Sequence, residues 1–271
     1  MTLDAVWPWV WALGGLLSGS FLNVMIHRWP LMLEPEQPAH HQLTLAFPRS
    51  HCPHCHTTLA WHQLIPVLSF VWLRGRCSHC QHPIAWRYPV VELLNMAWWL
   101  WCGLALPGSL TWGPSLAWSL WGSAVLALAW IDWESTWLPD GLTQPLAWGG
   151  LVAAALGWSG VSLPLALAGA VLGYLSLWSV ATVFQWVTGQ EGMGGGDFKL
   201  LAALGAWLGP LPLIPLVFLA ASAGAGVGLV LRARGQLREG RYVPFGPFLA
   251  LAAVLLVACG PSEVLHWIGL A

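Results

Sequence analysis

The sequence predicts an all-α polytopic membrane protein of about eight transmembrane helices with a small zinc-ribbon-like cytoplasmic insert. Of its 271 residues, 57% are hydrophobic and only 8% are charged, against about 25% charged in a typical soluble domain. The apolar residues occur in blocks of about 20, the length that crosses a hydrocarbon layer of about 30 Å. The one long polar stretch, residues 27–88, contains two CxxC pairs. Together these observations predict a membrane domain with one polar insert.

Seven apolar segments are candidate transmembrane helices. They cover residues 6–26, 89–106, 115–131, 141–158, 162–187, 211–231 and 245–259. An eighth segment, 198–208, reaches only about 16 Å at 1.5 Å per residue, so it could be a half-crossing or re-entrant helix. We therefore divide the chain into a first transmembrane helix (1–26), a cytoplasmic zinc-binding insert (27–88) and a membrane domain of about seven helices (89–271).

The ten Lys and Arg residues decide how many segments cross, because cytoplasmic loops are enriched in them. If segment 198–208 crosses, all ten lie on one side of the membrane. If it does not, the four arginines between Arg232 and Arg241 move to the opposite side. We therefore predict eight crossings, with both termini outside and the polar loops in the cytoplasm. The net charge of −1 argues against a nucleic-acid partner, since phosphate binding needs a concentrated positive field.

The polar insert contains a predicted metal site. Four of the six cysteines form two CxxC pairs, Cys52 with Cys55 and Cys77 with Cys80. Two such turns can direct four thiolates at one zinc ion, and four protein ligands leave no open position for substrate. The predicted zinc is therefore structural, and it stabilises an insert that has a small apolar core. A redox pair or incidental cysteines are the alternative, and His54 or His79 could replace a cysteine ligand.

Two aspartates stand at the ends of apolar segments, where ionisable residues are costly to retain and are candidates for function. Asp132 ends an apolar run, and Asp197 follows Gly194, Gly195 and Gly196. On the predicted topology both lie at the cytoplasmic boundary. Two carboxyls that share a site cannot both ionise cheaply, so one can act as a general base and the other as a general acid. A solvated helix-cap residue is the alternative interpretation of any single such carboxyl, Asp140 included.

Several segments resemble the type IV prepilin peptidase family in the same order along the chain. Residues 191–201 resemble the GxGD motif of that family, which here comprises Gly194, Gly195, Gly196 and Asp197. The segments 19–24, 27–30, 74–77, 87–92, 132–140 and 244–248 resemble its other signatures. One departure is Leu64, which precedes Ile65 and Pro66 where inserts of the family often have Asn.

The resemblance implies a function and a set of site residues. It implies that Asp132 and Asp197 are the catalytic pair, with Gly194, Gly196, Lys199 and Asp140 as supporting residues. It further implies a bacterial inner-membrane enzyme that cleaves the leader of prepilins or pseudopilins, for type IV pili or type II secretion, and then methylates the new N-terminus with S-adenosylmethionine. The cysteine insert is implied to support methylation, because shorter relatives that lack it only cleave.

Two alternatives remain open at the level of the sequence. The chain could be another GxGD intramembrane protease, without methylation, although proteases of the presenilin kind lack a two-CxxC insert. It could also be a non-enzymatic zinc-bearing scaffold of a secretion system, which would leave the aspartates without a role. No glycine-rich turn after a strand marks a methyl-donor site, so methylation rests on the resemblance alone. The sequence does not determine the oligomeric state.

Overall fold

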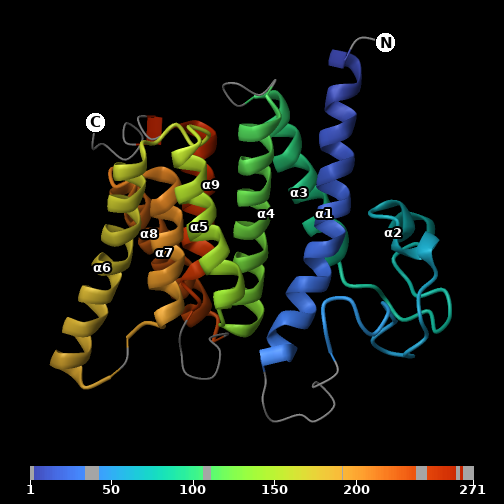
Figure 1. Cartoon of the computed structure of the whole chain (residues 1–271). Coiled ribbons are helices and arrows are strands. Elements are labelled where there is room, and N and C mark those ends of the chain that lie inside the picture. Colours follow the sequence, from blue (N-terminus) through green and yellow to red (C-terminus); the bar gives the residue numbers. More distant parts are fainter. Residues whose placement is uncertain are drawn as a thin grey trace. The chain divides into compact units, whose positions relative to one another are not determined.

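A computed structural model describes residues 3–33, 43–105, 111–190, 192–235, 243–260 and 263–264. Eight long helices lie within these residues (Figure 1). They are α1 (Leu3–Leu33), α3 (Arg87–Leu104), α4 (Trp112–Ser135), α5 (Asp140–Ala155), α6 (Leu163–Thr188), α7 (Gly195–Leu208), α8 (Leu213–Ala233) and α9 (Gly246–Cys259). Each predicted transmembrane segment falls on one of them, which confirms the predicted all-α fold. Glu191, Arg238 and Arg241 lie outside the described residues.

Four of these helices, α1 from Val6, α4, α6 and α8, are long and apolar enough to cross a membrane, and α9 is a shorter apolar helix. With the remaining helices they make a multi-pass membrane protein. The doubtful segment forms α7, whose 14 residues span about 21 Å. Most of α7 is buried, including Leu200, Leu201 and Leu204 at 0% exposure. A helix that is buried over most of its length belongs to the interior of a bundle.

The chain forms two compact units, Met1–Ala127 and Leu128–Ala271. In the first unit α1 packs against α3 through glycines. A methyl group on Gly15 would lie 2.6 Å from the Cα atom of Met96, so only a hydrogen side chain permits this approach. Asn95 of α3 then donates to the Gly15 carbonyl at 2.8 Å. The predicted division at residues 26 and 88 follows the membrane boundaries and stays a prediction.

Helix α1 continues to Leu33, past the predicted end of its span at Ile26. The extra turns place Arg28 on the helix, where it is 6% exposed. Its guanidinium donates to the carbonyls of Thr44 at 2.8 Å and Pro48 at 2.7 Å. The end of α1 therefore holds the beginning of the described part of the insert.

In the second unit α7 lies between α5 and α6 (Figure 1). The backbones of Gly169 in α6 and Gly205 in α7 are in direct contact. A methyl group on either residue would therefore overlap the other helix. On the opposite side Trp207 of α7 donates to the Leu146 carbonyl of α5 at 2.8 Å. These contacts fix α7, and with it the residues of its first turn.

Candidate active site and cysteine site

Asp132 lies in the last turns of α4 and is 5% exposed. Its Oδ2 accepts a hydrogen bond of 2.9 Å from the backbone N–H of Gly246, the first residue of α9. The first N–H groups of a helix have no partner inside the helix and carry partial positive charge, so they suit a carboxylate. A methyl group on Gly246 would lie 2.6 Å from that oxygen. Glycine is therefore the residue that allows this close approach.

Asp197 lies in the first turn of α7 and is 9% exposed. Its Oδ1 is buried and has no hydrogen-bond partner among the described residues. The two aspartates are close enough for their carboxyls to interact electrostatically. The structure thus brings together the two residues that the sequence predicts as a pair, although they lie on different helices.

Leu138 connects the surroundings of the two aspartates. A methyl group on Gly196, next to Asp197, would lie 2.8 Å from the Leu138 Cβ atom. A methyl group on Gly246 would lie 3.3 Å from a Leu138 Cδ atom. Leu138 follows a turn in which Thr136 has a φ of 60°, in the left-handed region. This turn returns the chain from α4 to α5 and so places Leu138 between α7 and α9.

The glycines of the GxGD motif differ in their surroundings. Gly196 packs against Leu138, so a side chain there would require movement. Gly194 and Gly195 have no described atom within 4 Å of the position that a Cβ would take. Gly194 is the N-cap of α7 with a φ of −75°, a conformation open to any residue. Gly194 and Gly196 are the two predicted supporting glycines. Among the described residues, packing requires a glycine at position 196 but not at position 194.

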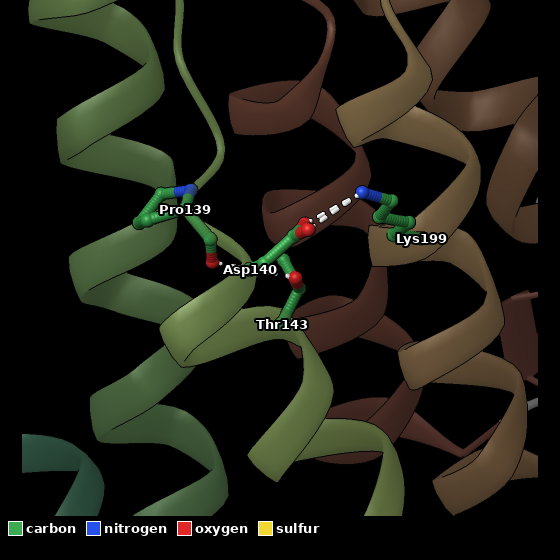
Figure 2. A network of polar contacts seen from close by, with 4 residues as sticks. All are labelled: Pro139, Asp140, Thr143 and Lys199. Carbon is green, nitrogen blue, oxygen red and sulfur yellow. Dashed lines mark hydrogen bonds and ion pairs between the residues drawn. The ribbon is translucent and has the colours of Figure 1, made fainter. Parts of the chain in front are cut away.

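Asp140 and Lys199 form an ion pair at the rim of the same unit (Figure 2). The Nζ atom of Lys199 lies 2.7 Å from Oδ1 and 2.8 Å from Oδ2 of Asp140. Asp140 begins α5 after the N-cap residue Pro139, and the Thr143 hydroxyl donates back to the Pro139 carbonyl at 3.3 Å. Two residues apart on a helix, Asp197 and Lys199 point to nearly opposite sides. Asp197 therefore faces inward while Lys199 reaches outward to Asp140.

The four predicted metal ligands also lie together. The Sγ atoms of Cys52, Cys55, Cys77 and Cys80 are all within 4.8 Å of one another. Hydrogen bonds from the side chain and the backbone of Thr57 lower the pKa of Cys55 to about 6, whereas burial and hydrogen bonds with the neighbouring cysteines raise the pKa of Cys80 to about 11. Thiolate is the form in which cysteine binds a metal. The donor set and its spacing thus fit a tetrahedral metal ion.

The two cysteine turns repeat one another, a regularity that sequence reasoning missed. In the first, the N–H of Cys52 donates to Thr57 and the N–H of His56 to Cys52; in the second, Cys77 donates to His82 and Gln81 to Cys77. His56 and Gln81 occupy equivalent places and both have positive φ. The sequence carries the signal, because residues 52–61 and 77–86 share the pattern CxHCxxxxAW. Such symmetry places four thiols around one point.

Sequence reasoning also missed the roles of Gly246 and Leu138. Both lie in segments that the resemblance singles out, 244–248 and 132–140. Nothing in the composition of these segments says that Gly246 hydrogen-bonds Asp132, because that contact joins residues 114 positions apart. The resemblance of these segments to family motifs was the only signal in the sequence, and the packing of the helices shows which contacts the two residues make.

Two buried, interacting carboxyls at helix ends of a membrane bundle are the arrangement expected of a membrane-embedded aspartyl peptidase. Residues 13–106 match the bacterial peptidase A24 N-terminal domain, and residues 119–229 match the type IV leader peptidase family. The chain belongs to the type IV leader peptidase family.

Relatives over almost the whole chain support this membership, and the three that follow are each named prepilin leader peptidase/N-methyltransferase. The Aeromonas hydrophila protein is 44% identical, over 96% of this chain and 94% of its own length. The Stutzerimonas stutzeri protein is 44% identical over 91% and 88%. The Burkholderia pseudomallei (strain 1026b) protein is 45% identical over 87% and 80%. No solved structure matches the chain. These comparisons do not favour the other GxGD protease or the non-enzymatic scaffold.

Proposed function

We propose that this chain removes the leader from prepilins or pseudopilins with the pair Asp132 and Asp197, and then methylates the new N-terminus. The observation that carries the proposal is the geometry of the two carboxyls. Both are buried, they interact with each other, and Asp197 Oδ1 is without a hydrogen-bond partner among the described residues. Burying a carboxylate oxygen without a hydrogen bond costs free energy, unless a substrate or a water molecule donates a hydrogen bond to it.

The pair supports hydrolysis by general acid–base catalysis. Two carboxyls in one site share a proton. The ionised carboxyl accepts a proton from water as the water oxygen attacks the peptide carbonyl carbon, and the protonated carboxyl donates to the carbonyl oxygen. The resulting tetrahedral species collapses when the C–N bond breaks and the leaving nitrogen takes up a proton. Gly246 holds Asp132 Oδ2, and Asp197 Oδ1 has no hydrogen-bond partner among the described residues, so it is an oxygen that can bind the water or the carbonyl.

Asp140 and Lys199 support this proposal as a positioning pair. Their ion pair joins the first turn of α5 to the first turn of α7, and α7 carries Asp197 two residues before Lys199. Lys199 directs its charge at both oxygens of Asp140, on the side of α7 away from Asp197. We therefore assign the pair to holding Asp197 in place, and not to the reacting atoms.

The cysteine cluster supports a structural zinc ion held by Cys52, Cys55, Cys77 and Cys80. Zinc supplies folding free energy there and leaves no coordination position for a substrate. The methyltransferase activity is proposed from the names of the relatives, with S-adenosylmethionine as the donor. The amine that cleavage releases is the group that methylation then uses, so one substrate end serves both reactions.

The proposed location is the bacterial inner membrane with the aspartates and the zinc insert on the cytoplasmic side. The placement of Lys and Arg supports this sidedness, because eight crossings put all ten on one face.

The deciding experiment combines the purified protein, a prepilin and an isotopically labelled methyl donor. Mass spectrometry should show the loss of the leader mass, followed by the gain of a labelled methyl group on the shortened product. Leader loss without methylation, by protein that still carries its zinc, would remove the transferase half of the proposal. An intact prepilin would remove both halves.

A further inference from the structure

The insert exposes large apolar side chains where a soluble domain would bury them. Its two short helices are η2 (Trp61–Leu64) and α2 (Leu68–Trp72). Five of their large apolar residues are between 41% and 76% exposed, and Phe70 is less exposed. We call these five the η2–α2 face: Trp61, Leu64, Leu68, Val71 and Trp72. Exposed apolar residues on transmembrane helices face lipid, but these lie outside every predicted span. An apolar patch of this kind marks a surface that something covers.

A hydrogen bond fixes the depth of this face relative to the membrane helices. The N–H of Val67, directly before α2, donates to Oε2 of Glu92 at 2.7 Å. Glu92 is 6% exposed, and it lies about 5 Å inside the predicted span 89–106 at 1.5 Å per residue. Val67 has a φ of 58°, which a β-branched residue rarely adopts. The contact with Glu92 therefore holds a strained turn, and α2 begins at the level of the span.

The position of the insert agrees with that depth. Figure 1 shows α2 level with the middle of α1 and not below the end of that helix. Arg28 of α1 bonds the carbonyls of Thr44, Leu45 and Pro48 and so holds the other side of the insert close to the same helix pair. The η2–α2 face is thus held alongside membrane helices.

The net positive charge of the insert indicates that the η2–α2 face fits a negatively charged surface. Residues 43–88 contain the arginines Arg49, Arg74, Arg76 and Arg87 and no Asp or Glu. Arg74 and Arg76 are exposed and follow α2 directly. Tryptophans beside apolar residues and arginines are typical of segments that lie in the interface of a membrane with anionic lipids.

We propose that the η2–α2 face is an interfacial anchor that inserts into the anionic lipid surface beside α3. The apolar residues enter the boundary of the acyl chains, and Arg74 and Arg76 bind lipid phosphates. Glu92 sets the depth by holding the turn at Val67. This role is independent of the proposed catalytic aspartates, so it can fail while they stand.

The test uses the full chain in nanodiscs of phosphatidylcholine and phosphatidylglycerol with lipids spin-labelled high on the acyl chain. A fluorescent non-natural amino acid replaces Leu68 or Trp72 in separate proteins, with exposed Thr58 and Pro83 as control positions. Labels at 68 and 72 should be quenched at least about twofold more than the controls. Bound zinc, measured by mass spectrometry, verifies that each labelled insert is folded.

A second measurement tests the arginines. Replacing phosphatidylglycerol by phosphatidylcholine, or changing Arg74 and Arg76 to Gln, should reduce the quenching at 72. Equal quenching at all four positions, or none at 68 and 72 with zinc retained, would overturn the proposal. Photo-cross-links from position 72 to residues 128–271 or to a prepilin, in place of lipid, would overturn it as well.

Discussion

Lys199 and Asp140 bind one another through both carboxylate oxygens, at 2.7 and 2.8 Å. The ion pair links the two segments that carry the aspartates. The chain runs from Asp132 through the turn at Thr136 to Asp140, and Asp140 binds Lys199. Lys199 lies two residues after Asp197 on α7. The separation of the two aspartates is thereby tied to an ion pair at the rim.

Neutralising either aspartate should abolish leader removal. Asp132→Asn and Asp197→Asn preserve shape but remove the acid–base function, so kcat should fall by at least about 10³-fold. The measurement is prepilin cleavage by each purified variant, with the unfolding midpoint as the control for structure. Cleavage at the wild-type rate in either variant would end the assignment of the catalytic pair.

Breaking the rim ion pair should lower kcat and leave KM nearly unchanged. Asp140→Asn and Lys199→Gln should each reduce kcat by on the order of tenfold, because small displacements of a catalytic group are costly. Their effect on stability should be under about 1 kcal/mol, since both side chains are exposed. Steady-state kinetics on prepilin cleavage separates the two parameters.

The exchanged variant Asp140→Lys with Lys199→Asp is the matched control. It should recover most of the lost kcat if the pair acts by position. A raised KM without recovery would instead mean that Lys199 contacts the substrate. The double variant Asp140→Asn with Lys199→Gln should be no worse than either single change, because both remove the same interaction.

A methyl group at Gly246 should disturb the catalytic site. In Gly246→Ala the added Cβ would lie 2.6 Å from Asp132 Oδ2, so the carboxyl must move. We expect kcat to fall by at least about tenfold. Gly226→Ala is the control, because no described atom lies within 4 Å of a Cβ there. Equal activity of the two variants would show that the Asp132 contact is not needed.

The GxGD glycines offer a comparison within one motif. Gly196→Ala places a methyl group 2.8 Å from the Leu138 Cβ atom, whereas Gly195→Ala meets no described atom within 4 Å. The first variant should lose more cleavage activity than the second, by about fivefold or more. Assaying both at one temperature checks this order, and the reverse order would contradict the packing of Leu138.

Removing a cysteine ligand should release zinc and unfold the insert. Cys77→Ser should lose the bound metal, and trypsin should then cut at Arg74 and Arg76 much faster, because a small metal site contributes much of its domain's folding free energy. Methylation should be lost while leader cleavage persists. Cys259→Ser, outside the cluster, should keep its zinc, and a zinc-loaded Cys77→Ser protein would refute the ligand assignment.

Sequence reasoning located the helices, and it singled out aspartates and cysteines that the structure brings together, for physical reasons. A span needs about 20 apolar residues, and composition alone reveals such blocks. Asp132 and Asp197 stood out because carboxyls at the ends of spans are costly. Cys52 and Cys77 stood out because metal turns have a local spacing. Each of these signals lies within a few neighbouring residues.

The sequence by itself thus determined the all-α membrane fold, the two aspartates as candidates and the four clustered cysteines. The tertiary structure alone decided that Gly246 holds Asp132, that Asp140 pairs with Lys199, and that Val67 binds Glu92 at the depth of a span. Those contacts join residues that lie far apart in the chain. They depend on how closely helices approach and on the directions of their side chains, which no local pattern of residues specifies.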